Sequence, residues 1–214
     1  MKKTLKSLLL MPLLALSLSA TAAPYTEGNQ YTKVNEVTTS KKEVREYFSV
    51  YCGHCFKFEP MMHALKKSLP EGVSFERNHV DFLRSASAKV QHTITKATIV
   101  AEQLGDANKL IGAVFNYIQV QRAVITSEKD LRNIFVLNGA DGDKFDQLMK
   151  SFSVNAQAKS LKKHQDDMVA KRALTGVPTV IVNGKYKIDR SKLDKDNFEK
   201  DYQNLVKYLL ELDA

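Results

Sequence analysis

The only two cysteines in this chain of 214 residues, Cys52 and Cys55, are separated by Gly53 and His54. A lone pair of cysteines is most often a structural disulfide. A bond across so short a loop, however, restricts the unfolded chain by only about 2 kcal/mol, against about 4.7 kcal/mol for a loop of about a hundred residues. Thiols at positions i and i+3 of a helix lie on one face, where a disulfide can open and close with little backbone movement. The spacing therefore predicts a switchable dithiol.

Two other kinds of site that use closely spaced cysteines match the sequence poorly. A structural zinc site needs a second pair of ligands, and the four histidines outside the motif show no paired spacing. Haem attachment requires a histidine directly after the second cysteine, where this chain has Phe56. We therefore expect neither a cofactor nor a metal.

The first 22 residues have the pattern of a cleaved secretory signal. Lys2, Lys3 and Lys6 precede an apolar run over residues 8–18, and the small residues at 20–22 supply a cleavage site. No later stretch approaches the roughly 18 uninterrupted apolar residues of a membrane span. We expect a soluble periplasmic protein, in an oxidising compartment where disulfides form and persist.

About 192 residues remain after cleavage, enough for one sizeable core or for a domain that carries an insertion. The formal charge of +8 falls to +5 without the three lysines of the signal segment, and the other charges are mixed in sign along the chain. No basic patch, long linker or internal repeat is visible. The composition therefore argues against nucleic-acid binding.

The first half of the expected core is a strand, the dithiol, a helix and a second strand. Apolar residues alternate over residues 43–50, which predicts a strand leading directly into the cysteines. From residue 55 to residue 69 they recur every three or four positions, which predicts a helix. Residues 73–80 have the pattern of the second strand.

Roughly 90 residues of helical periodicity follow, including a stripe formed by Phe145, Leu148 and Phe152. The strand pattern returns at Pro178. Asn183-Gly184 then separates two short apolar runs, which is a strong signal for a two-residue hairpin. A final helix is expected over residues 198–212.

In this order of elements the mature chain resembles a thioredoxin fold interrupted by helices, and more narrowly the DsbA family of periplasmic thiol:disulfide oxidases. The resemblance covers the whole mature chain and implies an α/β fold, with a thioredoxin-like domain of residues 23–82 and 175–214 and an inserted helical domain of residues 83–174. Its motifs are Tyr25-x-x-Gly28-x-Gln30-Tyr31, Glu46-x-Phe48-Ser49, Phe58-Glu59, Leu69-Pro70-Glu71-Gly72-Val73, His79-Val80, and Gly176-Val177-Pro178 followed by Val182-Asn183-Gly184-Lys185-Tyr186.

Cys52 is expected at the N-terminus of its helix as the nucleophile, with Cys55 facing the core as its buried partner. The unpaired N–H groups and the helix dipole favour a thiolate at Cys52, but the dipole supplies at most about 2 kcal/mol. A fall of three pKa units needs about 4 kcal/mol. We expect the remainder from hydrogen bonds of the first turn and from protonated His54. A stabilised thiolate makes the disulfide easier to reduce, which predicts a disulfide donor.

Four further residues are expected at the site. Glu46 shares a strand face with apolar residues. The resemblance implies that it is a buried acid beneath the cysteines, which takes up and returns the proton of Cys55. The alternative is that Glu46 is half-exposed at an open strand end. The resemblance also implies a cis peptide bond between Val177 and Pro178 against the dithiol, with backbone left free to pair with a client peptide. Gly53 is expected at the same client-binding surface.

The chain departs from the family pattern at two positions. It has Gly53-His54 where the family usually has Pro-His, a pairing shared with eukaryotic protein disulfide isomerases, which predicts a less oxidising site. Arg77 stands where lysine is more usual in the family. Arg77 and Glu59 both align with positions that are charged in the family, and we assign no role to either residue.

The leading functional hypothesis is an enzyme that donates its disulfide to folding exported proteins through a mixed disulfide. The resemblance implies reoxidation by a quinone-linked membrane partner of the DsbB type. One alternative is a disulfide isomerase or reductase that is kept reduced; another is a non-catalytic dithiol module that binds metal. Known bacterial isomerases carry an N-terminal dimerisation domain, whereas only about 29 mature residues precede Cys52 here, which argues against the isomerase alternative. We expect a monomer.

Overall fold

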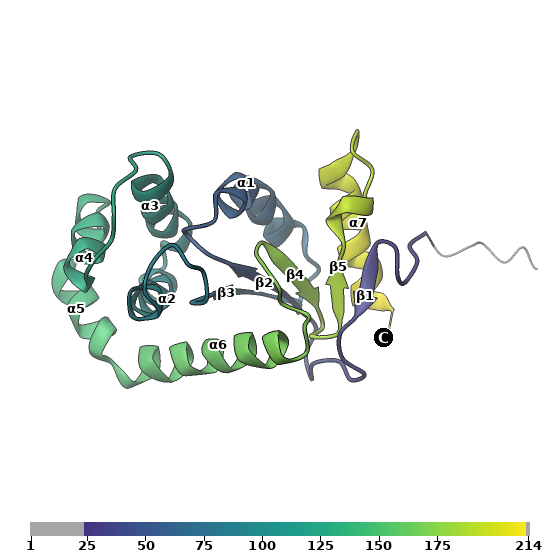
Figure 1. Cartoon of the computed structure of the whole chain (residues 1–214), viewed down its shortest axis with the longest axis horizontal. Coiled ribbons are helices and arrows are strands. Elements are labelled where there is room, and N and C mark those ends of the chain that lie inside the picture. Colours follow the sequence, from purple (N-terminus) through teal and green to yellow (C-terminus); the bar gives the residue numbers. More distant parts are fainter. Residues whose placement is uncertain (1–23, 213–214) are drawn as a thin grey trace, which may run out of the picture.

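A five-stranded sheet forms the centre of the computed structural model, which describes residues 24–212 (Figure 1). The strand order is β1-β5-β4-β2-β3, with β2 and β3 parallel and the other pairs antiparallel. The strands are β1 (Tyr31–Lys33), β2 (Glu43–Phe48), β3 (Ser74–His79), β4 (Thr179–Val182) and β5 (Tyr186–Ile188). The predicted signal segment lies outside the described residues.

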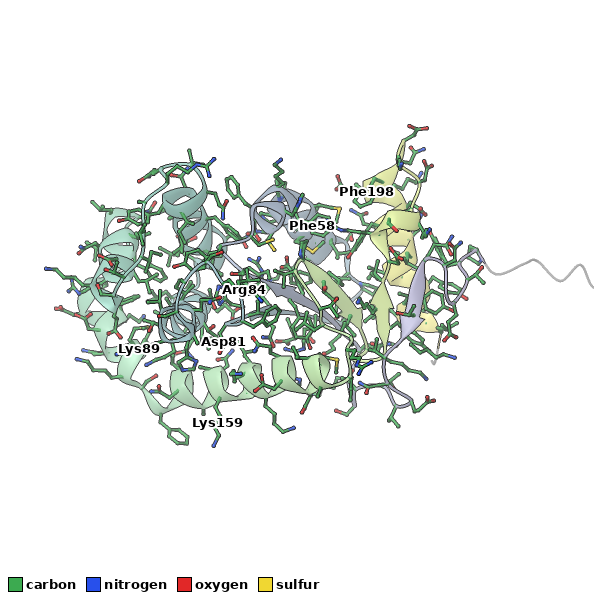
Figure 2. All side chains as sticks on the ribbon, in the orientation of Figure 1. Phe58, Asp81, Arg84, Lys89, Lys159 and Phe198 are labelled. Carbon is green, nitrogen blue, oxygen red and sulfur yellow. The ribbon has the colours of Figure 1, made fainter. Side chains whose placement is uncertain are left out.

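Helices cover both faces of this sheet, because alternate residues of each strand point to opposite sides. On β2, Val44 belongs to a buried cluster with Met62 and Leu209, whereas Tyr47 belongs to another cluster with Met168. Phe58, labelled in Figure 2, packs edge to face on Tyr202 with the ring centroids 5.8 Å apart. The covering helices are α1 (Gly53–Ser68) and α7 (Phe198–Glu211) on one face and α6 (Phe152–Ala170) on the other.

The remaining helices gather beyond the end of β2 that leads into the cysteines (Figure 1). They are α2 (Ala88–Gln103), α3 (Ala107–Gln119), α4 (Glu128–Leu137) and α5 (Gly142–Lys150). Phe135 and Phe145 meet edge to face in their core, with ring centroids 4.9 Å apart. The same buried cluster includes Phe48, Val50 and Cys55, so the helical core is continuous with the end of the sheet that carries the dithiol.

The predicted hairpin is confirmed. Asn183 and Gly184 have φ angles of 51° and 62°, as a two-residue turn with positive φ at both positions requires. Two sequence predictions were incomplete or wrong. The short strand β1, which pairs antiparallel with β5, was not predicted. Phe152 does not continue the stripe of Phe145: the chain breaks at Ser151, which caps a new helix, and Phe152 is left 88% exposed.

Within the described part of the chain, no helix combines the length and the apolar character needed to cross a membrane.

Candidate active site

Cys52 lies at the N-cap of α1, as predicted, and its sulfur accepts a hydrogen bond from the backbone N–H of Cys55 at 3.1 Å. The N–H of Cys52 donates to the carbonyl of Ser49 at 3.0 Å, and the N–H of Phe56 donates to the carbonyl of Cys52 at 3.1 Å. These bonds turn the chain from β2 directly into the helix. The sulfur consequently faces N–H groups that have no partner within the helix.

The two thiols differ strongly in acidity. The pKa of Cys52 falls from its ordinary value of 9.0 to about 7, chiefly because the thiol of Cys55 donates a hydrogen bond to it. Burial opposes this fall, while the backbone N–H groups of Cys55 and His54 and the charge of Arg190 support it. The pKa of Cys55 is raised, first because its proton is held by Cys52 and then because the side chain is buried. Cys52 is therefore the group that ionises.

Val177 and Pro178 lie directly against the reactive sulfur. The thiol of Cys52 donates to the carbonyl oxygen of Val177 at 3.4 Å. The peptide bond between Val177 and Pro178 is cis, which confirms the sequence prediction. The turn is held by the hydroxyl of Thr179, which donates to the carbonyl of Gly176 at 2.8 Å. Residues separated by more than a hundred positions thus meet at the dithiol.

The residues between the cysteines are exposed. The backbone N–H of His54 helps to lower the pKa of Cys52 by hydrogen bonding to its sulfur. Stabilisation of the thiolate by the imidazole of His54 stays a prediction. A methyl group at Gly53 would lie 3.5 Å from the side-chain oxygen of Gln119, an ordinary contact. Gln119, at the end of α3, donates to the carbonyl of Val50 at 2.7 Å. Sequence reasoning missed it, because nothing in its local pattern indicates a contact with the segment that joins β2 to the dithiol.

A buried chain of charges lies beneath the cysteines. Glu46 is 0% exposed, so the half-exposed alternative was wrong. Arg77 donates through Nε to Glu46 at 2.9 Å and through both terminal nitrogens to Glu59. Its guanidinium also lies 4.0 Å from the ring centroid of Phe48. Of the two residues to which the sequence assigned no role, Arg77 therefore compensates the buried acid, as an interior charge requires, and Glu59 is a second acid on the same guanidinium.

Glu46 keeps one oxygen, Oε1, without a hydrogen-bond partner within the described residues. Burial raises the pKa of Glu46, and the charge of Arg77 opposes that rise. The charge of Glu46 also contributes to the raised pKa of Cys55. The carboxyl group therefore acts electrostatically on the buried thiol, and it has a free oxygen with which to bind a proton.

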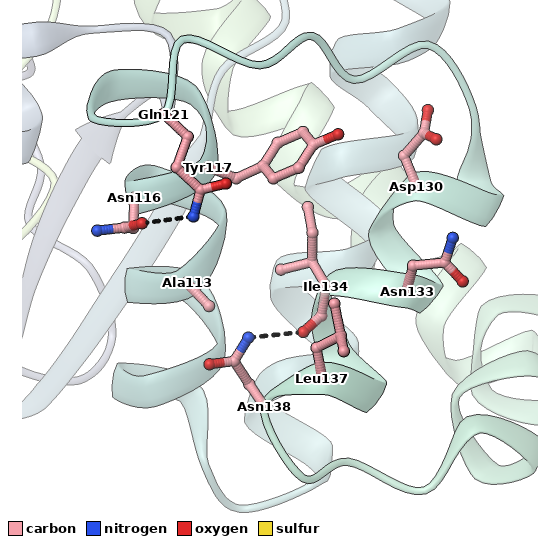
Figure 3. A pocket seen from close by; sticks show the side chains of 9 residues that line it. All are labelled: Ala113, Asn116, Tyr117, Gln121, Asp130, Asn133, Ile134, Leu137 and Asn138. Atoms are coloured by element: carbon pink, nitrogen blue, oxygen red, sulfur yellow. Dashed lines mark hydrogen bonds between the residues drawn. The ribbon is translucent and has the colours of Figure 1, made fainter.

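Other parts of the molecule offer less chemistry. A pocket of about 240 Å³ lies between α3 and α4 (Figure 3). Three of its amides are engaged with neighbours, since Gln121 donates to Asn116 and Asn138 donates to the carbonyl of Ile134. None of the predicted site residues lines this pocket. Among residues 24–212, no three His, Cys, Asp or Glu side chains are grouped so as to hold a metal ion.

Comparisons with known proteins agree on one family. Residues 43–203 match the family of DSBA-like thioredoxin domains. The thiol:disulfide interchange protein DsbA of Pectobacterium carotovorum is 38% identical over 201 residues, which cover 91% of this chain and 93% of that protein. The DsbA of Escherichia coli strain K12 is 37% identical over 204 residues, covering 92% and 94%.

Two solved structures extend this agreement to the fold. The DsbA of Proteus mirabilis, in complex with a non-covalently bound peptide, has a TM-score of 0.78 and 29% identity, and the match covers 88% of this chain and 99% of that one. The DsbA of Klebsiella pneumoniae has a TM-score of 0.75 and 29% identity, with the same two coverages.

Proposed function

Because this chain belongs to the family of DSBA-like thioredoxin domains and is a thiol:disulfide oxidoreductase, we propose that it donates the Cys52–Cys55 disulfide to folding exported proteins. The lowered pKa of Cys52 has the sign that this direction of transfer requires. A group that stabilises the thiolate stabilises the reduced protein, and this makes the disulfide easier to reduce and hence a better oxidant.

The transfer takes place in two exchange steps. A client thiolate attacks the sulfur of Cys52, the Cys52–Cys55 bond breaks, and Cys55 leaves with the electron pair. A second client thiolate then attacks the client sulfur of the mixed disulfide. The client disulfide forms and Cys52 leaves as a thiolate. Two electrons pass from the client to the enzyme, and the acidity of Cys52 makes it a good leaving group in the second step.

Glu46 exchanges a proton with Cys55 during the reaction. When Cys55 leaves in the first step, its raised pKa means that it takes up a proton. Glu46 is buried, has a raised pKa itself and keeps Oε1 without a partner in the described structure. It donates that proton during client oxidation and recovers it when the enzyme is reoxidised, which is general acid and base catalysis by one carboxyl group.

The client binds along the surface formed by Gly53, Val177 and Pro178. The exposed backbone at Gly53 and the carbonyl of Val177 beside the sulfur offer hydrogen-bonding groups to an extended peptide. Added-strand pairing of this kind recognises backbone and accepts varied sequences, which suits an enzyme with many clients. His54 lies at the same exposed edge, where its imidazole stabilises the thiolate when protonated.

The compartment and the partner follow from the same chemistry. We propose that residues 1–22 direct export to the periplasm, where the enzyme acts as a monomer. The reduced dithiol is returned to the disulfide by a quinone-linked membrane oxidoreductase of the DsbB type. That partner accepts the two electrons, so donation can continue without a bound cofactor in this chain.

The test is a single turnover without any other oxidant. Oxidised protein is mixed with an excess of a reduced, unfolded client that has two cysteines. We expect one client disulfide per Cys52–Cys55 pair, and no transfer by the Cys52→Ser variant. The Cys55→Ser variant, joined to a client through Cys52 beforehand, still releases oxidised client, because the second step needs only the client thiol.

The isomerase alternative predicts a different result. If the reduced protein rearranged a client with scrambled disulfides efficiently while the oxidised protein failed to transfer its bond, the donor function would be rejected. The metal-binding alternative predicts tight binding of a soft cation by the reduced protein, with no exchange in either direction.

A further inference from the structure

A pocket of about 320 Å³ opens beside Pro178, at the edge of the dithiol surface. Phe58 and Tyr202 form its aromatic wall, and Lys187 and Arg190 supply positive charge. Four segments of the chain therefore build it: β1, the dithiol helix α1, the hairpin strands β4 and β5 with the short 3₁₀ helix η1 (Arg190–Lys192), and α7. The sequence analysis did not identify this pocket.

Two cations, Lys187 and Arg190, outnumber the one carboxylate of the pocket, Asp189, on which the charge of Lys187 acts. Arg190 is exposed and lies with its guanidinium carbon 5.4 Å from the ring centroid of Phe58. In the structure of residues 24–212, neither Arg190 nor Lys187 forms an ion pair. Asp189 also lines the pocket, but its carboxylate caps η1 by accepting from the N–H and the hydroxyl of Ser191, at 3.0 and 2.7 Å.

The pocket lies within reach of a client that is bonded to Cys52. Pro178, which lines it, directly follows Val177, whose carbonyl oxygen is 3.4 Å from the reactive sulfur. An extended peptide advances about 3.3 Å per residue. A side chain a few residues from the client cysteine therefore reaches the pocket. The positive charge of Arg190 is also felt at Cys52, since it helps to lower the pKa of that thiol.

We propose that this pocket is a client subsite for an acidic side chain, and that Arg190, supported by Lys187, is a specificity-determining residue of the enzyme; this inference rests on the proposed function. A glutamate fits the pocket in both respects: its carboxylate meets the two cations, and its methylene groups pack on Phe58 and Tyr202. Clients with an acidic residue near the reacting cysteine are bound more tightly and oxidised faster.

The test compares reduced two-cysteine peptides of one length with glutamate, glutamine or lysine at a single position, scanned over three positions on each side of the first cysteine. The rate constant for oxidation by the oxidised protein is measured for wild type, Arg190→Gln and Arg190→Glu. Lys192→Gln is the matched control, because it removes a positive charge from η1 without changing the wall of the pocket.

At one position we expect the glutamate peptide to react about fivefold faster than the glutamine peptide, since a pair of exposed charges contributes at most about 1 kcal/mol. The ratio falls to about one in Arg190→Gln, favours the lysine peptide in Arg190→Glu, and is unchanged in Lys192→Gln. Comparing ratios cancels the effect of peptide charge on the peptide's own thiol and the effect of each variant on Cys52. Equal ratios in wild type and Arg190→Gln at every position would overturn the proposal, as would an equal loss in Lys192→Gln.

Binding without chemistry separates this proposal from the donor function. Peptides with serine in place of both cysteines cannot exchange disulfides, so their Kd reports the subsite alone. We expect about fivefold tighter binding of the glutamate peptide to wild type, lost in Arg190→Gln and weakened by salt. Tighter binding with no oxidation of the neutral peptide would reject the donor function and keep the subsite. Oxidation with no charge preference in either measurement would do the reverse.

Discussion

The stability of the reduced protein is expected to rise with pH relative to that of the oxidised protein, because only the reduced form has a titrating Cys52. Its pKa in the folded state is about 7, below the ordinary value of 9.0. A thiol with a depressed folded-state pKa adds stability that is fully present above the unfolded value and is lost as the pH falls through the folded value. The effect should therefore appear between about pH 6 and pH 9.

The size of the effect follows from the shift. Two pKa units correspond to about 2.7 kcal/mol when the titration is complete. Cys52 is half-buried, so solvent screening reduces this figure. At about pH 8 only part of it is realised, and we expect the reduced protein to gain about 1 kcal/mol relative to about pH 6. The raised pKa of Cys55 opposes the gain only near and above 9.0, which makes the lower range the informative one.

The assay is equilibrium unfolding in denaturant of the reduced and the oxidised protein at about pH 6, 7 and 8. The difference between the two forms cancels every titrating group that does not interact with the thiols. In the Cys52→Ala variant the reduced protein should lose the extra slope, which assigns it to this residue. A difference that stays constant with pH in the wild-type protein would refute the reasoning, because it would mean that Cys52 titrates in the fold as it does in the unfolded chain.

Two further outcomes are expected. Arg77→Gln should lower the free energy of unfolding by about 3–5 kcal/mol, because it leaves Glu46 and a second buried carboxylate without their cation. This loss should shrink at acidic pH as Glu46, whose pKa is raised by burial, takes up a proton. Arg132→Gln, which removes two surface ion pairs, should cost less than about 1 kcal/mol in the same denaturation experiment. In the reduced protein an alkylating agent should modify Cys52 rapidly and leave Cys55, which is 0% exposed, unmodified until the protein unfolds. Mass spectrometry would measure the rate of modification at each cysteine. Equal rates at the two cysteines would contradict the assignment of Cys52 as the nucleophile.

The parts of the fold that sequence reasoning predicted depend on local signals. The entry of β2 into the dithiol, the N-cap position of Cys52 and the hairpin turn at Asn183 and Gly184 are each fixed by neighbours in the chain. The buried position of Glu46 was also readable, because strand parity placed it among apolar residues. The family resemblance added the cis bond before Pro178, which no local pattern determines.

The features that were missed depend on contacts between distant segments. Strand β1 is only three residues long and is defined by its pairing with β5. The pairing of Arg77 with Glu46 and Glu59 joins β3, β2 and α1, and Gln119 joins α3 to the segment that follows β2. The prediction for Phe152 was wrong for a local reason: Ser151 caps a new helix there, and this changes which residues face the core.

The stabilisation of the Cys52 thiolate shows how such distant contacts complete a local motif. The helix dipole supplies at most about 2 kcal/mol, so the sequence requires further contributions. In the structure these contributions come from three sources: the thiol of Cys55, the N–H groups of the first turn, and the charge of Arg190. Arg190 follows the second strand of the hairpin, β5. The first two exist in any helix that begins with this spacing of cysteines. Arg190 does not, and a single substitution there should therefore alter both the acidity of the nucleophile and the choice of client.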